Sequence, residues 1–443
     1  MKLNYKRTFF IGFAFMSICA FWQLYDNLVP LILSKTFGLG ETMTGGIMAL
    51  DNVLALFLLP LFGALSDKTR TRLGKRTPFI IAGTIFAVIF MIFLPIADQL
   101  NHFVLFFISL AVVLLAMGSY RSPAVALMPD VTPKPLRSSA NSIINLMGTL
   151  GAIFTLVMSS ILIPKVNHPN YIPIYLAVAA LMVIAVTLLV ITIRENALVK
   201  ENEIINLKYQ EIPEQPESNM KETICSANGE AIDSANSDTM SGEVKKSLIF
   251  ILTSVFLWFT AYNAVTTAFT RYADKVWGLQ GGSFANTLLV ATGAATISYL
   301  PIGYLSGRFG RKKTILGGIL LMTLCYFFGF LSTSFSPAVF VIFAFTGIGW
   351  AAINVNSYPM VVEMSRGSDV GKYTGLYYTF SMAAQIFTPI LSGALLENVS
   401  YRTLFPYSFL FSILSLCTML CVKHGDSKPA RKRKALEHFD VDD

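Results

Sequence analysis

The chain has 443 residues, of which 54% are hydrophobic and only 14% are charged. A soluble chain of this length would carry roughly 25% charged residues over about three domains, so a soluble multidomain protein and a disordered chain are both excluded. Five cysteines are too few for a disulfide-rich secreted domain. The net charge of +8 indicates orientation in a membrane rather than nucleic-acid binding.

Twelve long apolar stretches follow one another along the chain. They cover residues 8–33, 45–65, 79–97, 103–129, 139–163, 171–193, 247–270, 283–306, 314–333, 337–362, 373–396 and 403–422. Each is long enough to cross a hydrocarbon core of ~30 Å as a helix, whereas the strands of a β-barrel would be shorter and would alternate in polarity. The first stretch differs from a cleaved signal peptide because it contains Asp26 and Pro30. The sequence therefore predicts an all-α polytopic membrane protein with 12 transmembrane helices.

The basic residues are distributed unevenly between the connections. An even number of spans places both termini on one side of the membrane, and the segments on that side contain 28 Lys and Arg residues against 5 in the opposite loops. Such an excess marks the cytoplasmic side. We expect a cell-membrane protein with both termini in the cytoplasm.

The polar segments divide the chain into four parts. Residues 1–193 form a half of six spans, and residues 247–422 form a second half of six. Between them, residues 194–246 are rich in Glu, Asn, Ser and Lys and are predicted to be a flexible cytoplasmic linker. Residues 423–443 form a basic tail, also predicted to be cytoplasmic.

The loop after the second span has a counterpart after the eighth. The first segment reads Leu-Pro, then Gly63-Ala-Leu-Ser-Asp67, then Gly74-Lys-Arg. The second segment reads Leu-Pro, then Gly303-Tyr-Leu-Ser-Gly307-Arg-Phe-Gly-Arg. This repeat indicates two duplicated halves, an organisation common in transporters that bind substrate near the midplane between the halves. Asp67, beside cationic residues, is predicted to form a latch that closes one side of the protein and breaks when that side opens. The second copy has Gly307 where the acid would be, which puts a second latch in doubt.

The Gly-x-x-x-Asp…Gly-basic-basic loop resembles the signature of the major facilitator superfamily. Its stretched form, residues 66–80, together with a second block from Arg121 to Asn141, is similar to sucrose–proton symporters and their glycoside–cation symporter relatives. The resemblance implies the major facilitator fold and alternating-access symport of a sucrose-like disaccharide or glucoside with protons. In sodium–melibiose relatives, paired acids on the second span bind sodium, and Ala55 and Leu59 stand at those places. Sodium coupling is therefore less expected than proton coupling.

Three charged residues lie inside the spans and are the main candidates for the mechanism. A guanidinium in a span is costly unless it faces a cavity or a partner, and Arg121 lies nine residues from Asp130, about 13 Å along a helix and too far for easy snorkelling. The resemblance implies that Arg121 contacts sugar or pairs with a proton-carrying acid. Asp51 and Asp26 are candidates for that acid, although either could instead make a structural contact near the outer surface.

Polar residues without charge add weaker candidates. Gln23, Asp26 and Asn27 share one helical face beside Trp22, a pattern that suits the hydroxyls and C–H faces of a sugar. The other candidates in spans, Asn145, Asn263 and Gln385, could equally serve as contacts between helices. The residues assigned to gating loops are Gly63, Asp67, Gly74, Lys75, Arg76, Asp130, Arg137, Arg308, Gly310 and Arg311.

Other classes of function have no support in the sequence. Zinc-protease and phosphate-binding motifs do not occur, and the four histidines lie outside the spans, so we expect neither an enzyme nor a metal site nor a cofactor. The expected partners are a small-molecule substrate and the lipid bilayer, without nucleic acid, and the expected state is a monomer. The alternative function is proton-driven export of small amphipathic compounds on the same fold.

Overall fold

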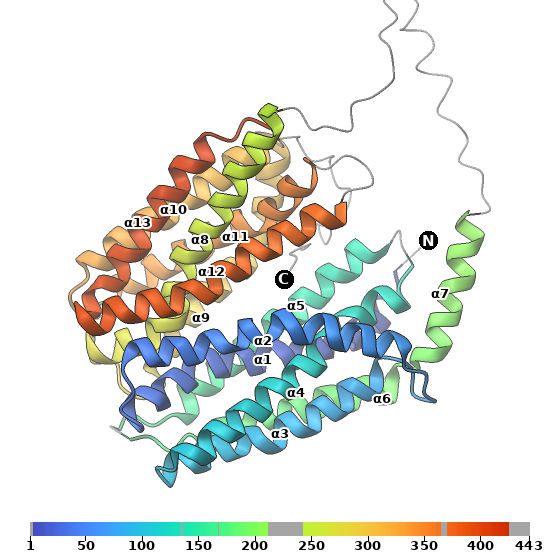
Figure 1. Cartoon of the computed structure of the whole chain (residues 1–443), viewed down its shortest axis with the longest axis horizontal. Helices are drawn as coiled ribbons and strands as arrows, with labels where there is room; N and C mark the ends of the chain where they lie inside the picture. The colour runs from blue at the N-terminus through green and yellow to red at the C-terminus, as the bar shows by residue number, and fades with distance from the viewer. Residues whose placement is uncertain (1–2, 134–135, 167, 211–241, 365–369, 425–443) are drawn as a thin grey trace, which may run out of the picture.

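The computed structural model describes residues 3–133, 136–166, 168–210, 242–364 and 370–424. Its helices, shown in Figure 1, are α1 (Tyr5–Lys35), α2 (Glu41–Lys68), α3 (Thr77–Gln99), α4 (Phe103–Val131), α5 (Arg137–Leu162), α6 (Ile172–Thr192), α7 (Glu195–Gln210), α8 (Gly242–Lys275), α9 (Ser283–Phe309), α10 (Arg311–Leu331), α11 (Ala338–Val362), α12 (Val370–Asn398), the short 3₁₀ helix η3 (Tyr401–Thr403) and α13 (Leu404–Leu420).

Twelve helices in the described residues are long and apolar enough to cross a membrane, all except α7 and η3. Each coincides with one of the twelve predicted stretches, within a few residues at either end. The helical form follows from the solvent, because a chain in hydrocarbon must satisfy its backbone polar groups internally. The prediction of an all-α protein with 12 transmembrane helices is therefore confirmed.

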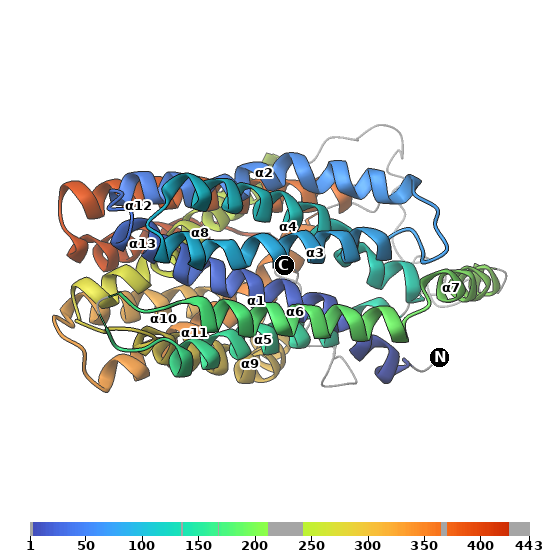
Figure 2. The ribbon, with the colours of Figure 1, turned by 90° about the horizontal axis from the view of Figure 1, so that it is seen from below.

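The helices form two bundles, one from α1–α6 and one from α8–α13, which lie side by side with α2 next to α12 (Figures 1 and 2). We call the end of the bundles where α1 begins and α13 ends the termini side, and the end with the α1–α2 connection at residues 36–40 the far side. In Figure 1 the two bundles meet at the far side and diverge toward the termini side.

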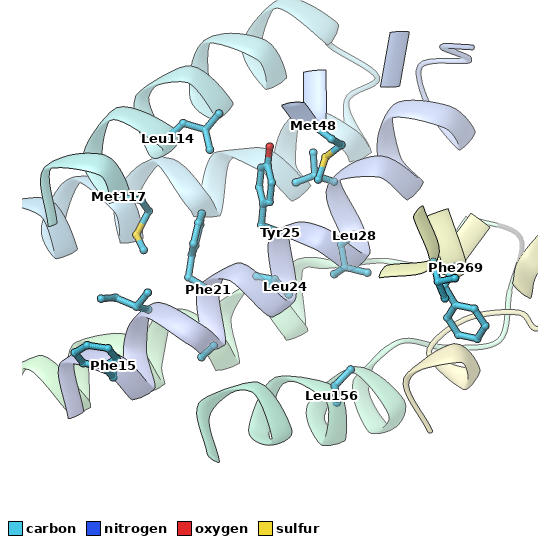
Figure 3. Packing of buried hydrophobic residues seen from close by; sticks show 14 of the residues in the cluster. Phe15, Phe21, Leu24, Tyr25, Leu28, Met48, Leu114, Met117, Leu156 and Phe269 are labelled. Atoms are coloured by element: carbon cyan, nitrogen blue, oxygen red, sulfur yellow. The ribbon is translucent and has the colours of Figure 1, made fainter. Parts of the chain in front are cut away.

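Helix α1 lies at the centre of the apolar core. Its side chains Phe21, Leu24 and Leu28 are at most 2% exposed, and Figure 3 shows them surrounded by residues of the neighbouring helices, including Met117 of α4 and Phe269 of α8. Because Phe269 belongs to the second half, the core continues from one bundle into the other on the side where they meet. Helix α1 thus supports side chains at the contact between the halves.

The segment between the halves differs from its prediction. The composition predicts a flexible linker over residues 194–246, but Glu195–Gln210 form helix α7 and Gly242 onward belongs to α8. Hydrogen bonds to a distant segment help to explain the difference, because Asn196 Nδ2 donates to the carbonyls of Thr71 and Arg72 in the loop between α2 and α3, each at 3.0 Å. Residues 211–241, and the basic tail after His424, lie outside the described residues.

Candidate functional site

A cavity of about 380 Å³ lies between the two halves, near the middle of the helices. Helices α1 and α5 of the first half line one side, and α8, α9, α10 and α11 of the second half line the other. A cavity of this size, with polar groups set among apolar ones, is typical of a small-molecule site. Its place between duplicated halves agrees with the position expected for a transporter.

The first half contributes a polar wall, which we define as Gln23, Asp26, Asn27, Asn145 and Thr149. Asn27 is only 1% exposed, and its Nδ2 atom finds no hydrogen-bond partner among the described residues. Leaving such a group unpaired costs about 1–3 kcal/mol, so a ligand that accepts a hydrogen bond there would be favoured. Four of these residues are candidates from the sequence, and the structure brings them together at the cavity.

The second half contributes an aromatic wall. The rings of Tyr262 and Trp350 stack face to face, with centroids 3.7 Å apart and an angle of 4° between planes, and we call this pair the aromatic platform. Phe259 packs edge-on against Trp350 at 5.4 Å and supports the platform from α8. Tyr326 also lines the cavity, with a buried hydroxyl that has no partner among the described residues.

Two candidate residues of the second half have different positions. Asn263 lines the cavity next to Tyr262, as expected for a ligand contact. Gln385 lies on α12 and does not belong to the cavity lining. Helix α12 packs mainly against α2 and α8, and none of its described residues belongs to the lining of this cavity.

The three charges inside the spans form one electrostatic cluster in the first half. Asp26 lines the cavity, while Asp51 of α2 and Arg121 of α4 lie outside its lining. Arg121 acts electrostatically on both acids, and Asp26 and Asp51 act on each other. The Cζ atom of Arg121 lies 5.9 Å from the ring centroid of Trp22, a cation–π distance.

Asp51 is held by its own helix. Its Oδ1 atom accepts hydrogen bonds from the backbone N–H of Asn52 at 2.6 Å and from Asn52 Nδ2 at 2.7 Å. The cluster therefore has an acid that faces the cavity and a second acid, set back from it, that is bound to protein groups. The shared neighbour of both is Arg121.

The predicted latch forms around Arg76, at the start of α3. Its guanidinium pairs with Asp67 at the end of α2, and its Nε lies 2.9 Å from Asp130 Oδ2 at the end of α4. Lys75 Nζ lies 3.1 Å from the same carboxylate. Gly63 brings α2 close to α4, since a Cβ there would lie 2.9 Å from Ser122 Oγ. We call Arg76, Asp67 and Asp130 together the latch.

The position of the latch corrects one expectation. The sequence predicts that it closes one side of the protein, but its ion pairs among the described residues lie within the first half, on the termini side, where the bundles diverge. Arg137 also stays in this half and donates from Nη2 to the carbonyl of Pro129 at 2.8 Å. The latch fixes α2, α3 and α4 to one another rather than joining the halves.

The second half has a simpler form of the same arrangement. Arg311, at the start of α10, pairs with Glu363 at the end of α11. Gly310 precedes it with a φ of +95°, and Arg308 Cζ lies 5.5 Å from the ring of Phe309. Helix α9 has no acid in place of the one missing at Gly307. The ion pair between Arg311 and Glu363 nevertheless corresponds to the Arg76–Asp130 pair of the first half.

Two ion pairs among the described residues join the halves, and both lie on the far side. Lys35 Nζ is 2.6 Å from Asp274 Oδ1, and Arg271 Nε is 2.8 Å from Glu41 Oε2. The second pair has side chains only 3% and 5% exposed, and Tyr401 also donates to Glu41. Sequence reasoning missed these residues because the paired groups stand at span ends in distant parts of the chain.

Among the described residues, no group of three or more His, Cys, Asp or Glu side chains is placed to hold a metal ion. The side chains that line the cavity offer hydrogen-bonding groups, aromatic rings and the carboxyl group of Asp26. Two six-helix bundles around a central polar cavity are the architecture of a membrane transporter.

Comparison with known proteins gives the family. The model of the Major Facilitator Superfamily matches residues 11–298 and 282–440, and the chain belongs to this superfamily. Its fold is similar to that of the nucleoside transporter NupG, with a TM-score of 0.63 and 16% identity over 95% of this chain and 99% of that one. It is also similar to a POT family transporter bound to 5-aminolevulinic acid, with a TM-score of 0.67 and 12% identity over 94% of both chains.

Two relatives match at the level of sequence. The chain is 32% identical over 123 residues to the chloramphenicol resistance protein CraA of Acinetobacter baumannii, covering 28% of this chain and 29% of that protein. It is 30% identical over 166 residues to the MFS-type transporter ppz2 of Metarhizium majus, covering 37% and 26%. The matched segments thus span less than a third of either relative.

Proposed function

We propose that the chain takes up a sugar, either a sucrose-like disaccharide or a glucoside, together with protons by alternating access. The observation that carries the proposal is the pairing of a polar wall with an aromatic platform across one cavity. Sugar hydroxyls need hydrogen-bond partners, and the C–H faces of a sugar ring pack on aromatic rings. The unpartnered polar atoms of Asn27 and Tyr326 favour a ligand with hydroxyl groups over an apolar one.

The charge cluster supports coupling to protons. In the proposed cycle, a proton binds Asp26 or Asp51 and weakens the attraction of that carboxylate for Arg121. The Arg121 guanidinium, next to the Trp22 ring, is then free to interact with the polar wall, and sugar binds. Ala55 and Leu59 stand where the sodium–melibiose relatives carry paired acids, which favours protons over sodium. We place the protein in the cell membrane as a monomer, with both termini in the cytoplasm.

The test is transport by the full chain in proteoliposomes. An inward proton gradient is imposed, and the accumulation of radiolabelled sucrose and of a panel of glucosides is measured, with Arg121→Ala as the matched control. We expect at least one sugar to accumulate against its gradient, a protonophore to abolish this, and replacement of sodium by choline to leave it unchanged. If no sugar of the panel accumulates, sugar symport is wrong.

A second candidate function is proton-driven export of small amphipathic compounds. The similarity to CraA and the aromatic wall favour it. The same proteoliposomes separate the two functions when their interior is made acidic and labelled chloramphenicol is supplied outside. An exporter that exchanges protons for drug would concentrate the label inside, whereas the sugar symporter would leave it at equilibrium.

A further inference from the structure

Glu195, the first residue of α7, is a buried acid to which the proposed transport cycle gives no role. Its side chain is 1% exposed although it lies beyond the last span of the first half. A buried carboxylate is costly unless hydrogen bonds satisfy it. The groups that satisfy Glu195 belong to another segment of the chain, the loop between α2 and α3.

The carboxylate of Glu195 caps helix α3. Its Oε1 accepts the backbone N–H of Lys75 at 2.8 Å and of Arg76 at 2.9 Å, and its Oε2 accepts the N–H and the hydroxyl of Thr77 at 2.9 and 2.7 Å. The first N–H groups of a helix have no partner within it, and a negative charge there is favourable. The residue at the N-cap position of α3, Arg76, provides no side-chain cap, so Glu195 supplies it from α7.

The backbone held by this cap belongs to the latch. Arg76 is bound through its N–H to Glu195, and through its guanidinium to Asp67 and Asp130. The Arg76 side chain is 6% exposed and that of Asp130 is 21% exposed, whereas the side chain of Asp67 is 59% exposed. Asp67 is therefore the partner of Arg76 that water can most easily replace.

The loop is shaped to receive this carboxylate. Gly74 has a φ of +126°, in the region that favours glycine, and a Cβ at this position would collide with the Glu195 side chain. Farther along α7, Asn202 Nδ2 donates to the carbonyl of Asp130 at 2.8 Å. Helix α7 thus binds the loop before α3 and the end of α4 at once.

We propose that Glu195 is a positioning residue for conformational exchange in this transporter. It fixes the backbone of Arg76, so that the guanidinium stays with Asp130 while Asp67 separates when α2 moves. Because α7 starts the segment that joins the two halves, the same carboxylate attaches that segment to the latch. The inference rests on the proposed function only in that the chain alternates between two conformations.

The test measures distances between the halves without any substrate. Spin labels are placed at Tyr5→Cys in α1 and Lys313→Cys in α10, in the full chain with its native cysteines replaced by serine, and pulsed electron resonance is recorded in nanodiscs. Glu195→Gln keeps the size of the side chain but replaces one acceptor oxygen by an N–H donor facing the backbone N–H groups. We expect the ratio of short to long distances to differ between Glu195→Gln and the unchanged chain by about threefold or more. A threefold difference corresponds to a change of about 0.6 kcal/mol in the free energy between the two conformations.

A matched control and a double variant decide whether Glu195 acts through the latch. Glu201→Gln removes another α7 carboxylate, which pairs with Arg7 and is 55% exposed, and should leave the distances unchanged. In an Asp67→Asn background, Glu195→Gln should add almost no further change, because the Arg76–Asp67 ion pair that Glu195 positions is already broken. A merely structural role would instead give additive changes in both backgrounds.

A milder variant protects the test against misfolding. Thr77→Val removes the hydroxyl that donates to Glu195 and nothing else of the cap, and should shift the distances in the same direction by a smaller amount. The proposal is overturned if Glu195→Gln behaves like Glu201→Gln, or if its effect adds in full to that of Asp67→Asn. Since no sugar is present, failure of sugar uptake and failure of this proposal remain separate results.

Discussion

The two halves share a scaffold but differ in what they present to the cavity. The first half contains every charged residue of the predicted spans, Asp26, Asp51 and Arg121, whereas the six predicted spans of the second half contain none. The second half instead presents the aromatic platform of Tyr262 and Trp350. Under the proposed function, this difference corresponds to a division of tasks, with ion coupling in the first half and substrate packing in the second.

Corresponding positions make the contrast direct. Arg121 lies nine residues before Asp130, the acid at the end of α4, and Asn354 lies nine residues before Glu363, the acid at the end of α11. Each acid pairs with an arginine of the duplicated loop in its own half, Arg76 or Arg311. The duplicated loops have thus kept their ion pairs, while the membrane positions above them have diverged in charge.

The largest expected effect tests this pair of positions. Arg121→Ala should lower proton-driven uptake about 100-fold, because it leaves Asp26 and Asp51 without their shared cation, and this corresponds to about 2.7 kcal/mol. Asn354→Ala, the matched change in the second half, should lower it by less than about threefold. Initial rates in proteoliposomes measure both. Equal losses would mean that the halves do not divide the tasks as described.

The next effect separates coupling from binding within the first half. One of the two acids, Asp26 or Asp51, is proposed to carry the proton. Replacing that acid by asparagine should abolish accumulation of sugar against its gradient, since a neutral side chain cannot deliver a proton. Exchange of labelled for unlabelled sugar at equal concentrations should fall only about threefold, because hydrogen bonding by the amide is kept. Retention of full accumulation in both variants would remove the two acids from the mechanism.

The aromatic platform gives a smaller effect with a different signature. Trp350→Leu should raise the KM for sugar up to about tenfold, because an aromatic contact is worth about 0.5–1.5 kcal/mol. The dependence of uptake on the proton gradient should stay as in the unchanged chain, and Trp350→Phe should restore much of the affinity. Loss of proton dependence in Trp350→Leu would show that the second half also takes part in coupling.

The smallest effect concerns the far side, where the halves are joined. Lys35→Gln removes the partner of Asp274, and the two side chains are 23% and 16% exposed. A partly exposed ion pair contributes about 0.5–1 kcal/mol, so the population with a closed far side should fall about threefold. Spin labels at Leu100→Cys and Val399→Cys, both exposed on this side, report the change. Lys165→Gln, an exposed far-side lysine, serves as the control.

Much of the fold could be predicted because the membrane leaves the backbone few choices. Apolar stretches of this length must be helices, and the duplicated loop shows how they group. Within the site, Asp26 and Asn27 were found by their spacing on one helical face, which α1 keeps. The position of Gln385 could not be found in this way, because the rotation of α12 about its axis depends on packing against α2 and α8.

Contacts between segments that are distant in the sequence could not be predicted for a different reason. Lys35 and Asp274 are separated by 239 residues, and only the packed structure brings them together. Glu195 was missed because the composition of residues 194–246 as a whole is polar, which hides the helix at its start. The signal that could have found it is an acid directly after a span, followed by residues that favour a helix.

The central position of α1 has a consequence for how the protein is made. This helix carries Gln23, Asp26 and Asn27 and has a mean hydropathy of 1.5, against 2.9 for α6. An aspartate near the middle of a span costs about 2.5–3.5 kcal/mol during insertion from the ribosome. We therefore expect α1 to be poorly retained by lipid alone during synthesis, and to become stable in the bilayer only once α5 and α6, its main neighbours in the first half, have emerged to pack against it.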